Sequence, residues 1–314
     1  MAADQQAVAL IQKRGGTVVG ETEVDLQETA VTDADLAHLA KLPKLTRLTL
    51  EGTPITDAGL AHLRALKQLR ELDLHDTAIT AAGLQHVNEL TGLTTLILNG
   101  TAVGDVGLAN LKSLTRLQWL DLSGCTITDR GVGLLKGFPE LRKCFLNLTG
   151  VSDAGLASLK SLTRLEELFL NGTAIADAGL AHLKGLTTLK MLTLSGTGVT
   201  DAGLAHLAGM TGLRKLFLGA TAVSDRGLVH LKGLTNLEML ILDGTNVTDK
   251  GLESLRGLTN LEWLDLNGTQ VTDRGLPALE PLEDLSELFV FESKVTETGA
   301  RALAKRMPDL AINR

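Results

Sequence analysis

The sequence is poor in aromatic residues and in cysteine. Its 314 residues include no Tyr, two Trp and six Phe, and the only cysteines are Cys125 and Cys144. Two cysteines are too few for the disulfide framework of a small secreted scaffold, so an apolar core has to hold the fold. Hydrophobic residues make up 44% of the chain, and this core therefore consists mainly of aliphatic side chains.

The chain also lacks long apolar runs and an excess of positive charge. No stretch has the character of a signal peptide or a transmembrane helix, so we expect no membrane partner. The formal charge is −7, whereas nucleic-acid binding needs a basic surface, so we expect no nucleic-acid partner either. The absence of a signal peptide and of a disulfide framework favours a cytoplasmic location, with a secreted protein trimmed of its leader as the alternative.

What the sequence has in abundance is repetition. A partial unit comes first, because Val24 and Leu26 stand where Leu48 and Leu50 stand one period of 24 residues later. Each unit follows the pattern LxxLxLxGTxVTDxGLxxLxxLxx, which we number as positions 1 to 24. Such a period predicts one supersecondary unit per repeat, stacked into a solenoid. The uninterrupted register is marked by Leu45, Leu69, Leu93, Leu117, Leu141, Leu165, Leu189, Leu213, Leu237, Leu261 and Leu285.

Two spacings within the unit predict a strand followed by a helix. Leu at positions 4 and 6 alternates as in a strand with one buried face. Leu at positions 16, 19 and 22 forms one helical stripe, and Gly at position 8 lets the chain turn between the two elements. Thr at position 12 and Asp at position 13 both suit a helix start. Where one is missing the other remains, because Ala81 follows Thr80 and Gly104 precedes Asp105.

The unit resembles the leucine-rich repeat family. The resemblance rests on LEELFLNGT (Leu165 to Thr173) and on VTDAGLAHL (Val199 to Leu207), which is similar to the bacterial GALA and the F-box-associated, cysteine-containing types. It implies an α/β fold, a curved right-handed horseshoe with a parallel sheet on the concave face and short helices on the convex face. One departure is Thr at position 9, where the family has Asn or Cys. We therefore expect hydroxyl groups to make the inward hydrogen-bond ladder.

The predicted organisation is a single domain. Residues 1–20 form an N-terminal cap, with an amphipathic helix from Asp4 to Arg14 and an edge strand over residues 17–19. Residues 21–308 hold twelve repeats, and residues 309–314 complete the C-terminal cap. Pro277 stands at position 17 of the last-but-one repeat, where it predicts a shortened or distorted helix.

Function has to be sought where the units differ. Side chains at positions 3, 5 and 7 point away from the core, and seven of the eight aromatic residues fall there. Aromatic and Met residues in one stripe are typical anchors of protein interfaces, although they also suit exposed strands for structural reasons alone. The predicted partner-binding residues are Trp119, Phe145, Phe169, Met191, Phe217, Met239, Ile241, Trp263, Phe289 and Phe291.

Charged residues are also sorted on this face, with sixteen acidic against seven basic side chains. Acidic groups around a binding face steer a basic partner. We therefore predict a monomeric, non-enzymatic module that binds a protein or peptide, favourably one with a basic segment. A small-ligand or carbohydrate receptor, a structural spacer and an excised part of a larger protein stay as alternatives. The predicted acidic rim consists of Asp25, Glu51, Asp73, Asp121, Asp243 and Asp265.

No group of residues predicts catalysis, a metal or another cofactor. His75 has Asp73, Asp76 and Glu51 near it on the concave face, an arrangement more typical of a solvated acidic patch than of a cation site. Cys125 and the other cysteine fall at inward positions, as buried thiols do. The remaining histidines occupy position 18 on neighbouring helices, too far apart to share one ion. They are His38, His62, His86, His182, His206 and His230.

Overall fold

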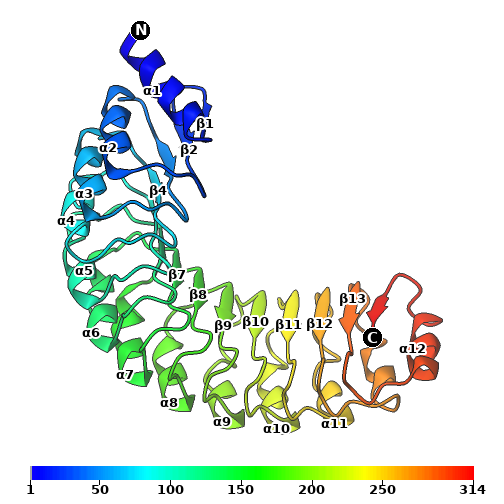
Figure 1. The fold of residues 1–314 in the computed structure, drawn as a ribbon. Helices are drawn as coiled ribbons and strands as arrows, with labels where there is room; N and C mark the ends of the chain where they lie inside the picture. The colour runs from blue at the N-terminus through cyan, green and yellow to red at the C-terminus, as the bar shows by residue number, and fades with distance from the viewer. Residues whose placement is uncertain (1) are drawn as a thin grey trace. The chain divides into compact units, whose positions relative to one another are not determined.

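The computed structural model describes residues 2–314 and divides into two units, residues 1–150 (unit 1) and 151–314 (unit 2). Both units alternate short strands with short helices, as the 24-residue pattern predicts (Figure 1). The strands of each unit lie side by side in sequence order. Among the described residues, no helix is long and apolar enough to cross a membrane.

Unit 1 begins with one helix followed by an antiparallel pair of strands. Helix α1 covers Ala2–Lys13, and β1 pairs antiparallel with β2, whereas the pairs from β2 to β7 are parallel. The strands are β1 Thr17–Val19, β2 Glu23–Asp25, β3 Arg47–Thr49, β4 Glu71–Asp73, β5 Thr95–Ile97, β6 Trp119–Asp121 and β7 Lys143–Phe145. The other helices are α2 Asp33–Leu36, α3 Asp57–Leu60, α4 Leu84–Val87, α5 Asp105–Ala109 and α6 Asp129–Val132, with 3-10 helices η1 Ala37–Lys41, η2 Ala61–Ala65 and η3 Leu135–Gly137.

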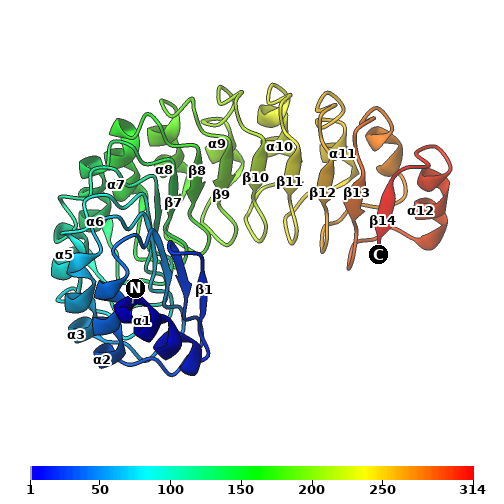
Figure 2. The same cartoon turned by 90° about the horizontal axis from the view of Figure 1, so that it is seen from above.

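Unit 2 has the same construction, with all its strands parallel (Figure 2). The strands are β8 Glu167–Phe169, β9 Met191–Thr193, β10 Lys215–Phe217, β11 Met239–Ile241, β12 Trp263–Asp265, β13 Glu287–Phe289 and β14 Ala311–Asn313. The helices are α7 Asp153–Leu156, α8 Asp177–Leu180, α9 Asp201–Leu204, α10 Asp225–Leu228, α11 Asp249–Leu252 and α12 Glu297–Ala304, with η4 Ala157–Ser161, η5 Ala181–Leu183, η6 Val229–Leu231 and η7 Leu276–Leu279. The repeat with Pro277 contains only η7, which confirms the predicted distortion.

The core lies between each sheet and its helices. In β10 the middle residue Leu216 is fully buried, and it lies in register with Leu192 and Leu240 on the neighbouring strands. Leu204 and Leu207 lie on the helical side of the core and are also fully buried. A single repeat has too few such residues to offset the entropy of ordering its chain, so neighbouring repeats stabilise one another.

The Asp at position 13 joins each repeat to the next. Thr200 is the N-cap of α9, because its hydroxyl accepts a hydrogen bond from Ala202 N–H at 3.3 Å. Asp177 of the preceding repeat accepts two bonds from Thr200, from its N–H at 2.7 Å and from its hydroxyl at 2.6 Å. The prediction that both residues cap the helix is thus right for Thr and wrong for Asp, whose side chain acts 23 residues away.

Gly at position 15 completes this junction. A Cβ atom on Gly203 would stand 2.4 Å from Asp177 Oδ1, closer than packed atoms approach, so only Gly leaves room for the carboxylate. We call the three residues the Asp–Thr–Gly contact. One junction of unit 1 lacks it, because Ala81 and Gly104 stand where Asp and Thr are needed. There the helix begins late, at Leu84, and Asn110 donates to the backbone oxygen of Ala81 at 2.7 Å.

Thr at position 9 hydrogen-bonds through its hydroxyl, as expected, but within its own repeat. The Thr53 hydroxyl donates to Leu50 O at 2.6 Å, and the same local bond recurs at Thr173 with Leu170 O. The expectation of an inward ladder is therefore wrong for these Thr residues. The Thr side chain is short, so its hydroxyl donates its hydrogen bond to the carbonyl oxygen three residues earlier in the same repeat.

Candidate functional site

The strands of unit 2 present two rows of side chains on the face opposite their core leucines. The helices α8 to α11 all lie on the other side of this sheet (Figure 1). The strand pairing places the residues of each row in register. The position 3 row is Glu167, Met191, Lys215, Met239, Trp263 and Glu287, and the position 5 row is Phe169, Thr193, Phe217, Ile241, Asp265 and Phe289.

The large apolar side chains of these rows are half-buried rather than fully exposed. Neighbours in the rows shield one another, and Trp263 stacks on Phe289 with ring centroids 4.6 Å apart. Phe291, at position 7 of the repeat that contains β13, lies in the turn after this strand; it is 46% exposed and is the most open of the predicted anchors.

Thr193 is the one hydroxyl residue of the position 5 row and stands between two Phe residues. It is only 1% exposed, because Phe169 and Phe217 flank it in register. Its hydroxyl accepts a hydrogen bond from Leu170 N–H at 3.3 Å, so its polar group is satisfied beneath the rings. The apolar surface therefore continues across the strand that carries Thr193.

Most cations along this face of unit 2 are paired with acids of a neighbouring strand. Lys190 Nζ lies 2.6 Å from Glu166 Oε2, and Arg214 pairs with Glu238. Burial raises the pKa of Asp265, and the nearby Asp243 carboxylate raises it further, against hydrogen bonds from Asn267 that lower it. The predicted rim residues Asp243 and Asp265 are therefore brought close together, with Asp265 at the end of β12 and Asp243 in the turn that follows β11.

Unit 1 carries a smaller aromatic pair on the corresponding face. Trp119 and Phe145 stack with ring centroids 5.7 Å apart, and Lys143 Nζ lies 5.0 Å from the Trp119 ring centre. The ammonium over the ring is a cation–π contact. Two of the ten predicted anchors thus belong to unit 1, and the other eight belong to unit 2.

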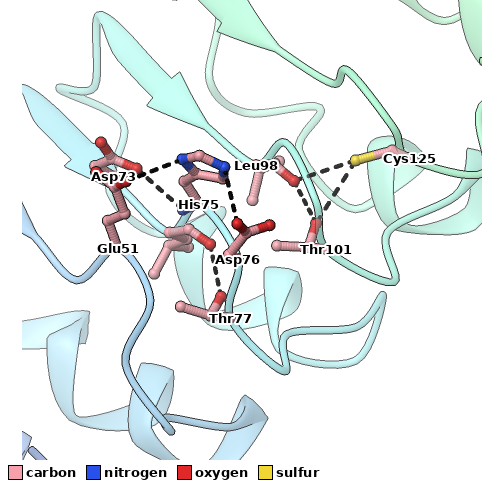
Figure 3. Close-up of polar contacts among 9 residues, drawn as sticks. Glu51, Asp73, His75, Asp76, Thr77, Leu98, Thr101 and Cys125 are labelled. Carbon is pink, nitrogen blue, oxygen red and sulfur yellow. Dashed lines mark hydrogen bonds and ion pairs between the residues drawn. The ribbon is translucent and has the colours of Figure 1, made fainter. Parts of the chain in front are cut away.

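The acidic residues of unit 1 gather around His75 (Figure 3). His75 Nδ1 lies 3.4 Å from Glu51 Oε1, as expected from adjacent strands, and Nε2 lies 3.2 Å from Asp76 Oδ2. The backbone N–H of His75 donates to Asp73 at 3.0 Å. Burial raises the pKa of Asp73. The hydrogen bond from the His75 N–H and the charge of the His75 ring act in the opposite direction, but burial has the larger effect.

The remaining rim residues of unit 1 lie on either side of this cluster. Burial also raises the pKa of Asp121, which accepts a hydrogen bond from Ser123 N–H at 2.9 Å. Asp25 is exposed and accepts from Gln27 N–H at 2.9 Å. Within residues 2–314, no group of three or more His, Cys, Asp or Glu side chains is arranged to hold a metal ion.

Both cysteines are buried free thiols, as predicted from their inward positions. Cys125 donates to Leu98 O of the preceding repeat at 3.1 Å and lies 3.6 Å from the Thr101 hydroxyl (Figure 3). Burial raises the pKa of Cys144 to about 12, so this thiol stays protonated at neutral pH. Neither group has the exposed, low-pKa character of a nucleophile.

Lys215 is the one cationic residue of these rows, and the predicted site left it out. The same alternation that exposes Phe217 also exposes Lys215 two residues earlier on β10. A search for aromatic residues passes over it, although its position in the row can be read from the repeat.

Comparison with known proteins identifies the repeat. The leucine-rich repeat family model matches residues 113–136 and 257–279. No curated protein matches the sequence. Among solved structures, an internalin from Listeria monocytogenes is similar over 91% of this chain and 93% of its own, with 24% identity and a TM-score of 0.60. A leucine-rich repeat protein from Leptospira interrogans is similar over 88% of this chain and 80% of its own, with 17% identity and a TM-score of 0.59.

These likenesses agree with the repeat pattern and with the parallel sheets and short helices of both units. Leucine-rich repeat proteins are generally protein-interaction modules and typically have no enzymatic activity. The chain therefore has the leucine-rich repeat fold, and the family model matches two of its segments.

Proposed function

We propose that the concave face binds a protein or peptide partner. The anchors are the apolar residues of unit 2, which we call the unit 2 patch; Trp119 and Phe145 of unit 1 form a separate candidate surface of the same character. The observation that carries the proposal is the run of half-exposed aromatic and Met side chains on a sheet face that no described helix of unit 2 covers. The unit 2 patch consists of Phe169, Met191, Phe217, Met239, Ile241, Trp263, Phe289 and Phe291.

Two physical arguments favour binding over a purely structural role. A contiguous apolar surface gains free energy when a partner removes it from water, and on soluble proteins such surfaces mark interaction sites. Aromatic and Met residues are also enriched at interfaces, where a few of them carry most of the binding energy. A role confined to folding needs no such side chains here, because the buried Leu rows already supply the core.

The proposal is tested with peptides selected on the protein itself. A phage library of random twelve-residue peptides is panned on the immobilised full chain, and the affinity of each recovered peptide is measured by biolayer interferometry. We expect Phe217→Ala to weaken binding about 30-fold, which corresponds to roughly 2 kcal/mol.

Val229→Ser is the matched control. Val229 is an exposed apolar residue of the same unit, 44% exposed, but it lies on η6 at the helical side. Its substitution is expected to leave the peptide affinities unchanged. A library that yields no peptide able to distinguish Phe217→Ala from the wild type contradicts the proposal.

A further inference from the structure

Lys215 occupies the centre of the unit 2 patch. It lies in register with Met191 on one side and Met239 on the other, and Phe217 follows on the same face of β10. It is the only cation of the position 3 and position 5 rows of unit 2. An ammonium group among apolar side chains has fewer water neighbours than one on an open surface, so its charge interacts more strongly with a nearby anion.

Lys215 also differs from its neighbours in its pairing. Lys190 and Arg214, at the margin of the same strands, are each paired with a glutamate. Within the described residues, no carboxylate forms an ion pair with Lys215. The charge is therefore available to an anionic group on a molecule that covers the patch.

Two strands further along, the patch carries the opposite charge. Asp243 lies in the turn that follows β11 and Asp265 is the last residue of β12, and in the described part of the chain neither makes an ion pair with Lys or Arg. They are close enough for the charge on Asp243 to disfavour ionisation of Asp265. Two uncompensated carboxylates of this kind are complementary to a cation.

Building on the proposed function, we infer that the partner segment bound by the unit 2 patch is dipolar. It places a carboxylate against Lys215 and a basic group against Asp243 and Asp265, with apolar side chains between them over Met239 and Ile241. Asp265 lies two strand spacings, about 10 Å, across the sheet from Lys215 and two residues, about 7 Å, further along the strand direction, so the two ends are about 12 Å apart. That separation corresponds to about four residues of an extended segment crossing the strands obliquely, or to about two turns of a helix.

The basic segment that the sequence predicts in the partner therefore has a defined position and direction on the patch. The basic end of the partner lies toward β12 and the acidic end toward β10. Reversal of the partner would place like charges against each other at both ends, so the charges select one direction of binding.

The test uses recovered peptides whose binding depends on Phe217. We expect these peptides to contain an Asp or Glu and, at a separation matching about 12 Å, a Lys or Arg. Replacing the peptide's acid by its amide is expected to weaken binding at least fivefold. Lys215→Glu is expected to weaken binding at least tenfold, and changing the peptide's acid to Lys is expected to restore affinity for that variant only. The double change Asp243→Asn and Asp265→Asn is expected to weaken binding at least fivefold.

Lys232→Glu is the control, because it makes the same change of net charge on an exposed lysine at the end of η6 on the helical side. Its affinities are expected to match those of the wild type. Peptides that require Phe217 but bind Lys215→Glu as tightly as the wild type overturn the dipolar inference and leave the proposed function standing. Peptides that are indifferent to Phe217 overturn the proposed function, and the dipolar inference falls with it.

Discussion

The two faces of unit 2 differ in how strictly they repeat. On the helical side the Asp–Thr–Gly contact recurs with nearly constant geometry, so that the Thr N–H bonds to Asp177, Asp225 and Asp249 are all 2.7 Å long. On the concave side the residue at position 3 changes from Met191 to Lys215 within one repeat. The repeated residues make the contacts that stack one repeat on the next, whereas the residues that vary on the concave side are not needed for that stacking. Substitutions on both sides of the sheets test this division.

The largest effect on stability is expected within β10, where neighbouring residues face opposite sides. Leu216→Ala removes a fully buried side chain and leaves a cavity, so it should lower the free energy of unfolding by about 2–5 kcal/mol. Phe217→Ala removes a half-exposed ring and should cost about 1 kcal/mol. Urea unfolding followed by circular dichroism measures both. An equal or larger loss for Phe217→Ala would mean that the concave ring serves the fold.

The Asp–Thr–Gly contact is tested by a double-mutant cycle at Asp177 and Gly203. Asp177→Ala removes two hydrogen bonds to Thr200, and Gly203→Ala forces a Cβ against the carboxylate, so each should cost about 1–3 kcal/mol. In the double variant the clash disappears, so the second substitution should cost little beyond the first. Additive losses in urea unfolding would show that the two residues do not contact each other.

The junction in unit 1 that lacks the contact offers the reverse experiment. The combined change Ala81→Asp and Gly104→Thr introduces the two missing side chains, and Gly107 already stands at position 15 to make room for the carboxylate. Two new hydrogen bonds should raise the free energy of unfolding by about 1 kcal/mol. Each single change serves as the control and should give less than half of that gain. A double variant no more stable than the wild type would show that this junction is adapted to Ala81.

The smallest effect is expected at Asp121 of unit 1, and it depends on pH. Because burial raises the pKa of this carboxyl in the folded protein, its ionisation lowers the stability as pH rises from the unfolded-chain pKa through the folded pKa. Asp121→Asn should therefore raise the midpoint of thermal unfolding at pH 7, by an amount equivalent to less than about 1 kcal/mol. The gain should vanish below about pH 3.9, where the carboxyl is protonated in both states.

The pKa of Asp273 is shifted in the opposite direction to that of Asp121. Hydrogen bonds from Thr296 lower the pKa of Asp273, so its ionised form stabilises the folded protein above the unfolded-chain pKa, and this stability is lost as pH falls through the folded pKa. Asp273→Asn should therefore lower the unfolding midpoint at pH 7, with a smaller loss in acid. Identical pH profiles for the Asp121 and Asp273 variants would refute the assignment of opposite shifts.

The sequence predicts the fold well because the Leu residues that recur every 24 residues are also the residues that are buried. Leu at positions 4 and 6 has to face inward in every repeat, and the register of Leu216 with Leu192 and Leu240 follows from the constant spacing. It predicts the inter-repeat contacts poorly. Asp177 is next to a helix start, where local capping is the simpler expectation, and only the three-dimensional stacking brings it to Thr200.

The candidate site shows the same limit. Alternation places Phe169, Thr193 and Phe217 on the concave face. It contains no information about neighbouring strands, so it does not predict that Thr193 is buried between the two rings. Exposure depends on the sizes of neighbouring side chains across strands. The pairing of Arg214 with Glu238, which leaves Lys215 as the unmatched cation, also depends on three-dimensional positions that spacing does not specify.

The methionines allow the most direct measurement of the central claim, that the concave face of unit 2 binds the partner. With methyl-labelled methionine, a peptide recovered from the library is titrated while the methyl resonances are followed by NMR. We predict that Met191 and Met239 shift, whereas Met210, which is 2% exposed in the core, and Met307, which follows α12, stay unchanged. Binding that leaves Met191 and Met239 unshifted would contradict the account.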